Sequence, residues 1–263
     1  MKAKKSLGQN FLNSKTVAHD VVTAAKVNEK DTVLEIGPGT GFLTRQILNF
    51  AGKVYAVEKD SDLIPQLKTE FASDVESKKM EIIEGDILEE ETLKKIRVKN
   101  GEYKLVANIP YYITGQILRT FLSGEKKPSS ITLMLQKEVA SRIVAHDGKE
   151  SLLSLSVKVY GTPKYIKKVP ARYFSPKPKI DSAILHIENI SKKNFKSEKE
   201  EALFFEIIKA GFAHKRKFLT RNLETLFNKE KIEKLFQTCE ISAKARAENV
   251  PLEKWLSLTK NAP

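Results

Sequence analysis

The sequence Thr32-Val33-Leu34-Glu35-Ile36-Gly37-Pro38-Gly39-Thr40-Gly41 decides the fold. Its first five residues, three of them Val, Leu and Ile, are typical of a buried strand, and a helical pattern follows from Phe42 to about Phe50. The glycines between them predict a turn whose main-chain N–H groups and helix start lie next to a bound ligand. A strand, a glycine turn and a helix in this order predict an α/β fold.

The spacing of these glycines argues against two common nucleotide sites. The turn lacks the Gly-Lys-Ser/Thr ending of a P-loop. It also misses the dinucleotide pattern, because the third glycine position is occupied by Phe42 or Thr44, depending on which glycine begins the count. Nicotinamide and flavin cofactors are therefore disfavoured.

Acidic residues follow the next two predicted strands. The strand Lys53–Val57 ends at Glu58, 21 residues after Gly37, where a carboxylate can accept both hydroxyls of a ribose. The strand Met80–Ile83 is followed by Gly85-Asp86, and that carboxylate can accept a hydrogen bond from an adenine amino group. A single acid at a strand end is usually solvated, but ligands of open α/β sheets bind at these ends. The succession predicts one shared site.

A fourth strand, Tyr103–Val106, leads into Ala107–Tyr112, which contains Asn-Ile-Pro-Tyr. The side-chain oxygen of Asn108 and a carbonyl at Ile109 or Pro110 can accept hydrogen bonds from an exocyclic amine, so that the nitrogen lone pair localises. Proline fixes the backbone and brings no competing N–H. Tyr111 can stack on a base. An isolated Asn-x-Pro-Tyr sequence is usually no more than a strand that ends at a proline turn. Here, however, three preceding strands end in residues suited to ligand binding, and this context favours a catalytic role for Asn108.

Composition and charge favour a polyanionic partner. The 263 residues include 46 Lys and Arg against 33 Asp and Glu, a net charge of +13, and the pI is about 9.5. The electrostatic field of such a positive charge attracts nucleic acid more strongly than an acidic small molecule. Cys239 is the only cysteine and there are four histidines, so we expect neither an internal disulfide nor a metal.

The region after residue 190 is predicted to form a second domain. The charged stretch 189–200 reads as a linker, and residues 191–263 carry 16 basic and 10 acidic side chains. We therefore expect one large α/β domain at 1–190 and a small basic helical domain at 191–263. The helices expected in the second domain are 201–210, 216–227, 230–238 and 252–259. The run His214–Lys217, with Arg221 and Asn222, opens one of these helices, a position where a solvated face is the usual explanation.

Several other segments have predicted structures. Helices are expected at 113–122 and 137–145, and strands at 131–135, 164–169 and 183–188, the last two as an antiparallel finish to the sheet. The pattern of Ser151–Tyr160 fits a strand or a helix, and we favour a helix. Phe174–Pro178 is expected to be a stiff loop.

The amino terminus is not expected to contain a signal peptide, and a helix is expected to follow it. Residues 1–10 are basic and then polar, without an apolar core, and no later run has the length of a membrane helix, so a cytosolic location is expected. Ser14 is the expected N-cap of a helix with Val17, Val21, Val22 and Ala25 on one face. The preceding Gly8–Phe11 is a simple leader or a polar lid with an aromatic anchor.

The motifs together resemble the S-adenosylmethionine-dependent ribosomal RNA adenine dimethyltransferase family. The matching stretches, in family order and spacing over about residues 5–225, are Leu7–Leu12, Leu34–Thr44, Val57-Glu58, Gly85–Ile87, Asn108–Tyr111, Leu135–Ala140 and Phe174–Ser182. The resemblance implies a Rossmann-like S-adenosylmethionine-dependent methyltransferase domain at 1–190, followed by a small all-α domain at 191–263. In this second domain the run His214–Lys217, with Arg221 and Asn222, would contact the RNA backbone.

The resemblance also implies residue roles. Asn10 and Leu12 would flank S-adenosylmethionine, Gly37 and Gly39 would lie against it, Glu58 would hold its ribose, Asp86 its adenine amine, and Asn108 the junction with the target base. Catalysis would fall to Asn108, Pro110, Tyr111 and Phe174, with Tyr111 and Phe174 sandwiching the target adenine. The roles of Asn10, Leu12 and Phe174 rest on the resemblance alone.

The resemblance implies dimethylation of two adjacent adenosines in a hairpin loop near the 3′ end of small-subunit 16S ribosomal RNA. The partners would be this RNA and the small ribosomal subunit or its precursor, with a role in subunit biogenesis, no membrane and a monomeric enzyme. One alternative is a large-subunit adenine methyltransferase of the macrolide-resistance type; Gly211–Leu223 and the Gly-Pro-Gly-Thr-Gly-Phe form favour the small-subunit branch. The other is a non-catalytic RNA-binding assembly or transcription factor, which has no use for Asn108.

Overall fold

The computed structural model describes residues 3–4 and 7–262, which group into two compact units. The first unit extends to Ala140 and resumes at Thr162–Ile190. The second consists of Ser141–Gly161 and the residues from Ser191 onward. The segment 141–161 thus groups with the C-terminal helices, whereas the sequence analysis placed it in the first domain.

Seven strands form one sheet in the described part of the first unit. In spatial order they are β4 (Met80–Glu84), β3 (Lys53–Glu58), β2 (Thr32–Ile36), β5 (Tyr103–Asn108), β6 (Ser130–Gln136), β9 (Ser182–Glu188) and β7 (Thr162–Val169). The first five are parallel, and β9 runs antiparallel to both β6 and β7. The predicted Rossmann-like sheet with an antiparallel finish is confirmed.

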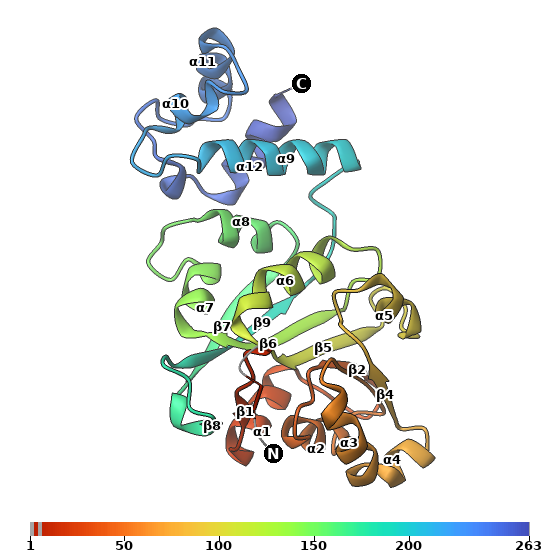
Figure 1. Ribbon diagram of the computed structural model, residues 1–263. Coiled ribbons are helices and arrows are strands. Elements are labelled where there is room, and N and C mark those ends of the chain that lie inside the picture. The colour runs from red at the N-terminus through yellow and green to blue at the C-terminus, as the bar shows by residue number, and fades with distance from the viewer. Residues whose placement is uncertain (1–2, 5–6, 263) are drawn as a thin grey trace. The chain divides into compact units, whose positions relative to one another are not determined.

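Helices cover both faces of this sheet. They are α1 (Lys15–Ala24), α2 (Phe42–Leu48), α3 (Ile64–Glu70), α4 (Ala72–Glu76), α5 (Glu90–Lys95), α6 (Thr114–Ser123) and α7 (Lys137–Val144), the last of which runs on into the second unit. Figure 1 shows α1, α2 and α3 on one face and α5 and α6 on the other. Helix α1 begins as predicted, because the Ser14 side chain accepts the N–H of Val17.

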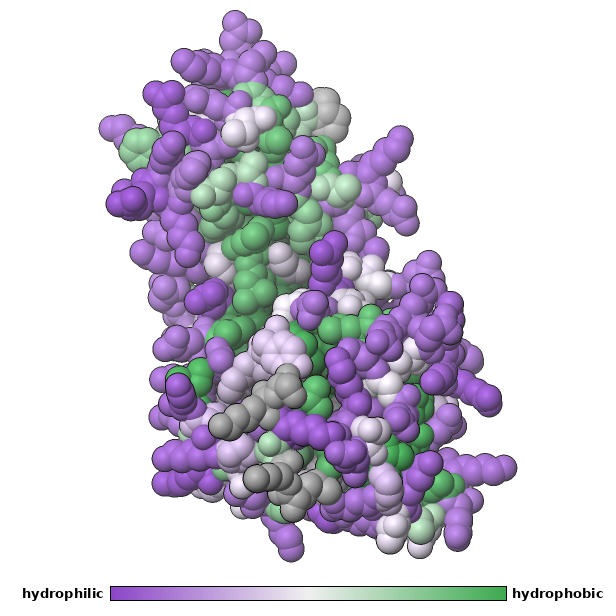
Figure 2. Space-filling model, in the orientation of Figure 1, coloured by the Kyte–Doolittle hydropathy of each residue, from purple (hydrophilic) through white to green (hydrophobic). Residues whose placement is uncertain are grey.

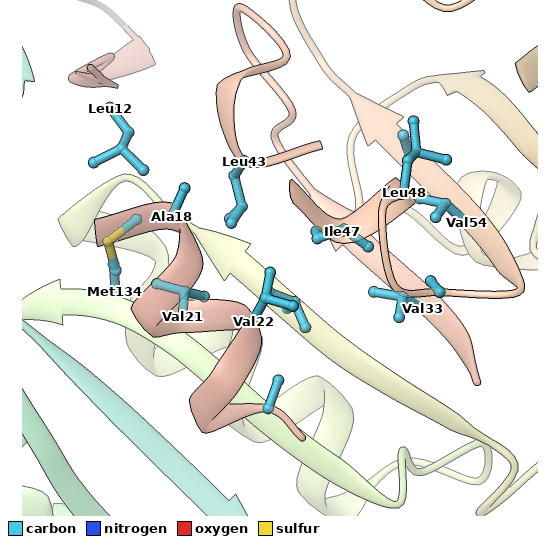
Figure 3. Close-up of a cluster of buried hydrophobic side chains, with 14 of the residues drawn as sticks. Leu12, Ala18, Val21, Val22, Val33, Leu43, Ile47, Leu48, Val54 and Met134 are labelled. Carbon is cyan, nitrogen blue, oxygen red and sulfur yellow. The ribbon is translucent and has the colours of Figure 1, made fainter. Parts of the chain in front are cut away.

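An aliphatic cluster fixes the glycine turn to the sheet. Val21 and Val22 of α1 and Ile47 of α2 are fully or almost fully buried with Val33 of β2 (Figure 3). Burial of each such side chain stabilises the fold by roughly 1.5–3 kcal/mol. Because α2 follows directly on Gly41, this packing sets the position of the turn.

The parallel register brings the strand ends to one edge. Ile36 at the end of β2 is paired with Val57 on one side and Ala107 on the other, and Glu58 is paired with Glu84. The residues that follow Ile36, Val57, Glu84 and Ala107 therefore emerge together.

A second, two-stranded sheet joins the amino terminus to a later loop. Strand β1 (Phe11–Leu12) pairs antiparallel with β8 (Phe174–Ser175). Phe174–Pro178 was predicted to be a loop throughout, but its first two residues form β8. The main chain of Phe11 and Leu12 supplies a pairing partner that local sequence cannot reveal.

The second unit is helical. It contains α8 (Leu152–Lys158), α9 (Glu198–Gly211), α10 (Leu219–Leu223), α11 (Lys229–Thr238) and α12 (Leu252–Asn261). The helical interpretation of 151–160 is confirmed, with Ser151 as its N-cap. Trp255 of α12 is fully buried, and a Cβ on Gly211 of α9 would lie only 2.4 Å from its ring. Helices α9 and α12 therefore pack closely at that glycine.

The predicted helix 216–227 is wrong in extent. Residues 213–218 form an exposed turn, and only Leu219–Leu223 is helical. The buried Asn222 side chain donates to the carbonyls of Gly211 (2.6 Å) and His214 (3.1 Å), which holds the turn in a non-helical path. Long-range bonds of this kind override local helix propensity.

The surface of the face shown in Figure 2 is largely hydrophilic. Among the described residues, no helix is long and apolar enough to cross a membrane. The prediction that no signal peptide begins the chain concerns residues 1–10, of which 1–2 and 5–6 lie outside the described residues.

Candidate active site

One cavity lies at the strand ends of the first unit. It is lined by segments 7–12, 36–40, 42–43, 57–59, 85–87 and 108–113. The predicted site residues on its wall are Asn10, Leu12, Gly37, Gly39, Glu58, Asp86, Asn108, Pro110 and Tyr111. Phe174 is not among the lining residues.

The glycine turn leaves open space at one position and is tightly covered at another. Gly37 has φ +68°, and a Cβ built there would meet no atom within 4 Å, so its side faces free space at the cavity. Gly39 has φ +59°, and a Cβ there would lie 2.9 Å from the Phe11 ring. Only glycine satisfies both positions without strain.

Glu58 ties the end of β3 to this turn. Its Oε2 accepts the N–H of Gly39 at 3.0 Å, and its Oε1 accepts the N–H of Asp60 at 2.8 Å. Burial raises the pKa of Glu58, although these hydrogen bonds oppose the effect. Each oxygen keeps a further lone pair with which to accept a ligand hydroxyl.

Asp86 is paired with a lysine that the sequence analysis did not single out. Lys59 Nζ lies 2.7 Å from Asp86 Oδ2, and the N–H of Leu88 donates to Oδ1 at 3.0 Å. Burial acts to raise the pKa of Asp86, but these donors outweigh it and hold the pKa below its usual range. An ionised acceptor at the end of β4 suits an amino group.

The orientation of the Asn108 amide is set by its neighbour. Its Nδ2 donates to the main-chain carbonyl of Asn10 at 3.0 Å. Since only the NH₂ end of an amide can donate, the side-chain oxygen must face the other way and is available as an acceptor. Pro110, two residues further on, has φ −56° and ψ 135°, an extended conformation in which the proline ring fixes φ.

The two aromatic residues expected to hold the base are in different surroundings. Tyr111 lines the cavity, its hydroxyl lies 2.8 Å from Ser182 Oγ, and burial raises its pKa. Phe174 is only 3% exposed, lies opposite Leu12 in the β1–β8 pair, and belongs to the hydrophobic core.

Two polar groups near the strand ends, Lys59 and Glu35, were missed. Lys59 lines the cavity, as does Tyr112, which is 62% exposed and is the last residue of the stretch Ala107–Tyr112. Glu35, in the strand before the turn, is 1% exposed with no hydrogen-bond partner for either oxygen within the described residues. A carboxylate inside an otherwise apolar strand was the available signal for Glu35. The position of Lys59 beside Asp86 depends on a pairing 27 residues apart.

Among the described residues, no group of three or more His, Cys, Asp or Glu side chains could hold a metal ion.

Comparisons with known proteins cover almost the whole chain. The model of the family described as "Ribosomal RNA adenine dimethylase" matches residues 1–262. The chain is 37% identical over 262 residues to the ribosomal RNA small subunit methyltransferase A of Fusobacterium nucleatum, covering 98% of this chain and 97% of the relative. It is 41% identical over 260 residues to the protein of that name from Dehalococcoides mccartyi, covering 98% and 88%.

Solved structures agree in fold. A dimethyladenosine transferase from Plasmodium falciparum superposes with a TM-score of 0.79 at 26% identity, covering 94% of this chain and 95% of that one. The 23S rRNA methyltransferase ErmE gives a TM-score of 0.76 at 23% identity, covering 96% and 99%, which shows a shared fold. Because the family model matches residues 1–262, this chain belongs to the ribosomal RNA adenine dimethylase family.

Proposed function

We propose that this protein transfers two methyl groups from S-adenosylmethionine to the exocyclic nitrogen of adenosine in small-subunit 16S ribosomal RNA. The proposed targets are two adjacent adenosines in a hairpin loop near its 3′ end. The observation that carries the proposal is the single cavity that gathers nine of the ten predicted site residues. The small-subunit choice is supported by relatives of that name matched over 98% of this chain.

The residues around the cavity fit the methyl donor. The open side of Gly37 leaves room for its methionine part, which any larger side chain would occupy. Glu58 at the end of β3 offers two oxygens to the ribose hydroxyls, and Asp86 at the end of β4 accepts from the adenine amine. Asn10 and Leu12 would close the cavity from the amino-terminal side, and Gly39 completes the turn.

S-adenosylmethionine supplies a methyl group activated by its sulfonium sulfur. The protein's own task is to align the attacking nitrogen and exclude water. The Asn108 oxygen and a carbonyl at Ile109 or Pro110 accept hydrogen bonds from the amine, which localises its lone pair. No general base is required, because the nitrogen becomes acidic once alkylated and its proton leaves to water. After the first transfer only one N–H remains to be accepted, so the second transfer needs a pocket with room for one methyl group.

The target adenine must be unstacked from the RNA before it enters. We propose that Tyr111 stacks on it and that Phe174 forms the opposite wall. Because Phe174 is 3% exposed, this role requires β8 to shift when the base enters. The proposal therefore includes a local opening of the β1–β8 pair.

The exposed turn of the second unit is the proposed RNA backbone contact. Lys215, Arg216 and Lys217 lie on it, and all three are exposed. Cationic side chains on an exposed turn bind phosphates and release counterions. We further propose that the enzyme is a monomer without a metal, works in the cytoplasm on the small subunit or its precursor, and contributes to subunit biogenesis.

Mapping of the modified base tests the proposal. Undermethylated small-subunit and large-subunit RNA, each free and in its subunit, are treated with enzyme and S-adenosylmethionine and analysed by primer extension and mass spectrometry. We expect dimethyladenosine at two neighbouring positions of the small-subunit RNA. A block only in large-subunit RNA would support the macrolide-resistance type instead, and no methylation of any substrate would favour a binding factor.

A further inference from the structure

The segment Gln9–Leu12 contacts several parts of the site at once. The Asn10 carbonyl accepts from Asn108, the Phe11 ring lies against Gly39, and Leu12 is paired with Phe174. The segment therefore touches the amine-polarising amide, the glycine turn and the proposed base wall. Among the residues that the structure describes, its strand pairing is limited to the two-residue β1–β8 ladder. A ladder of that length is marginal by itself, so side-chain contacts must hold the segment in place.

A buried acid, Asp60, provides one of these contacts. It is 4% exposed, and its carboxylate accepts from Gln9 Nε2 at 2.7 Å and from Lys4 Nζ at 2.6 Å. Its own N–H donates to Glu58 Oε1 at 2.8 Å. Asp60 thus connects the amino-terminal segment, bound through its carboxylate, to the residue proposed to hold the ribose, bound through its main-chain N–H.

The charge on Asp60 favours a firm contact. Burial acts to raise the pKa of Asp60, but the bonds from Lys4 and Gln9 outweigh it and keep the pKa below its usual value. The carboxylate is ionised at neutral pH, and hydrogen bonds to an ionised acceptor are about twice as strong as neutral ones.

We propose that Gln9 and Asp60 form a latch that holds Gln9–Leu12 over the cofactor cavity. Closed, the latch slows departure of the cofactor and keeps the Asn10 carbonyl where it orients Asn108. Gln9 and Asp60 are therefore positioning residues. Exchange of spent for fresh donor between the two transfers proceeds through the open latch. The inference rests on the proposed function, because the ligand it retains is the methyl donor or its demethylated product.

The experiment compares three variants of the full-length chain. Gln9→Ala removes the amide that reaches Asp60. Gln9→Glu places a second carboxylate against it and makes the contact repulsive. Asp62→Asn is the matched control, because Asp62 also pairs with Lys4 at 2.6 Å but its side chain is 71% exposed. If Gln9→Ala folds poorly, as judged by thermal unfolding, Gln9→Asn, one methylene shorter, replaces it.

Two measurements without turnover report on the latch. They are the dissociation rate of S-adenosylhomocysteine in stopped flow and the amide exchange of Leu12 and Asn13 by mass spectrometry. Loss of one charge-assisted bond predicts dissociation about tenfold faster in Gln9→Ala. We expect a larger change in Gln9→Glu, faster exchange in both, and wild-type behaviour in Asp62→Asn. In turnover assays of the two Gln9 variants, KM for the donor should rise because the donor dissociates faster. Their kcat should fall as well, because Asn108 loses its orientation.

The outcomes separate the latch from the proposed function. If wild type binds S-adenosylhomocysteine and both Gln9 variants release it at the wild-type rate, the latch is refuted while the proposed function stands. Equal acceleration in Asp62→Asn also refutes it, because the effect would then come from surface charge. If wild type binds no S-adenosylhomocysteine, the proposed function fails, and the latch fails with it.

Discussion

The buried carboxyl of Glu35 should make the fold less stable as the pH rises. Burial raises its pKa to about 8 from 4.5, and repulsion from Glu58 adds to the shift. Between these two values the folded protein holds one proton more than the unfolded chain. Stability from this group is therefore fully present below about pH 4.5 and is lost as the pH rises to about 8.

The size of this effect follows from the shift. Each pKa unit corresponds to about 1.4 kcal/mol, so the loss is on the order of 5 kcal/mol over the whole range and about 2–3 kcal/mol between pH 6 and pH 8. Glu35→Gln removes the titration and keeps the shape. The cost of burying an amide is the same at both pH values and cancels in the comparison.

Urea unfolding followed by circular dichroism at pH 6, 7, 8 and 9 measures the effect. The free energy of unfolding of Glu35→Gln should rise relative to wild type by about 2–3 kcal/mol from pH 6 to pH 8 and change little above pH 8. Glu84→Gln, at an exposed residue at the end of β4, is the control and should follow wild type. Parallel profiles for Glu35→Gln and wild type would refute the reasoning.

Three further variants test other parts of the structure. Gly37→Ala should weaken S-adenosylhomocysteine binding at least about tenfold in calorimetry, since its methyl group enters the cavity; Gly101→Ala, also at positive φ with nothing within 4 Å, should match its stability loss and keep binding intact. Asn222→Ala should lower the free energy of unfolding by about 1–3 kcal/mol in urea, because the Gly211 and His214 carbonyls lose their donor; an unchanged midpoint would contradict this. Replacing Lys215, Arg216 and Lys217 by Ala should flatten the salt dependence of RNA binding by up to about one unit of slope per lost phosphate contact; an unaltered slope would return them to a solvated face.

The sheet and most of the site could be predicted because they depend on local patterns. Apolar runs ending at Gly37, Glu58, Asp86 and Asn108 indicate parallel strands, and parallel strands bring their ends together. The same reasoning supplied Ser14 as a helix cap. These features can be predicted from the periodicity of apolar residues along the sequence and from the chemistry of the residue that follows each strand.

The remaining features depend on contacts between distant residues. The helix expected from Arg216 begins only at Leu219, because Asn222 binds carbonyls up to 11 residues away. The Lys59–Asp86 pair and the Gln9–Asp60 contact join positions 27 and 51 residues apart. The burial of Phe174 follows from its pairing with Leu12. Periodicity carries no information on such pairings.

The most direct test of the central claim combines binding and chemistry in Asn108→Ala. S-adenosylhomocysteine binding is measured by calorimetry and dimethyladenosine in small-subunit RNA by mass spectrometry, with wild type in parallel. We expect measurable binding by both proteins, two dimethylated adenosines with wild type, and transfer reduced by roughly two or more orders of magnitude in the variant. Wild-type turnover by Asn108→Ala would show that this amide does not activate the target amine.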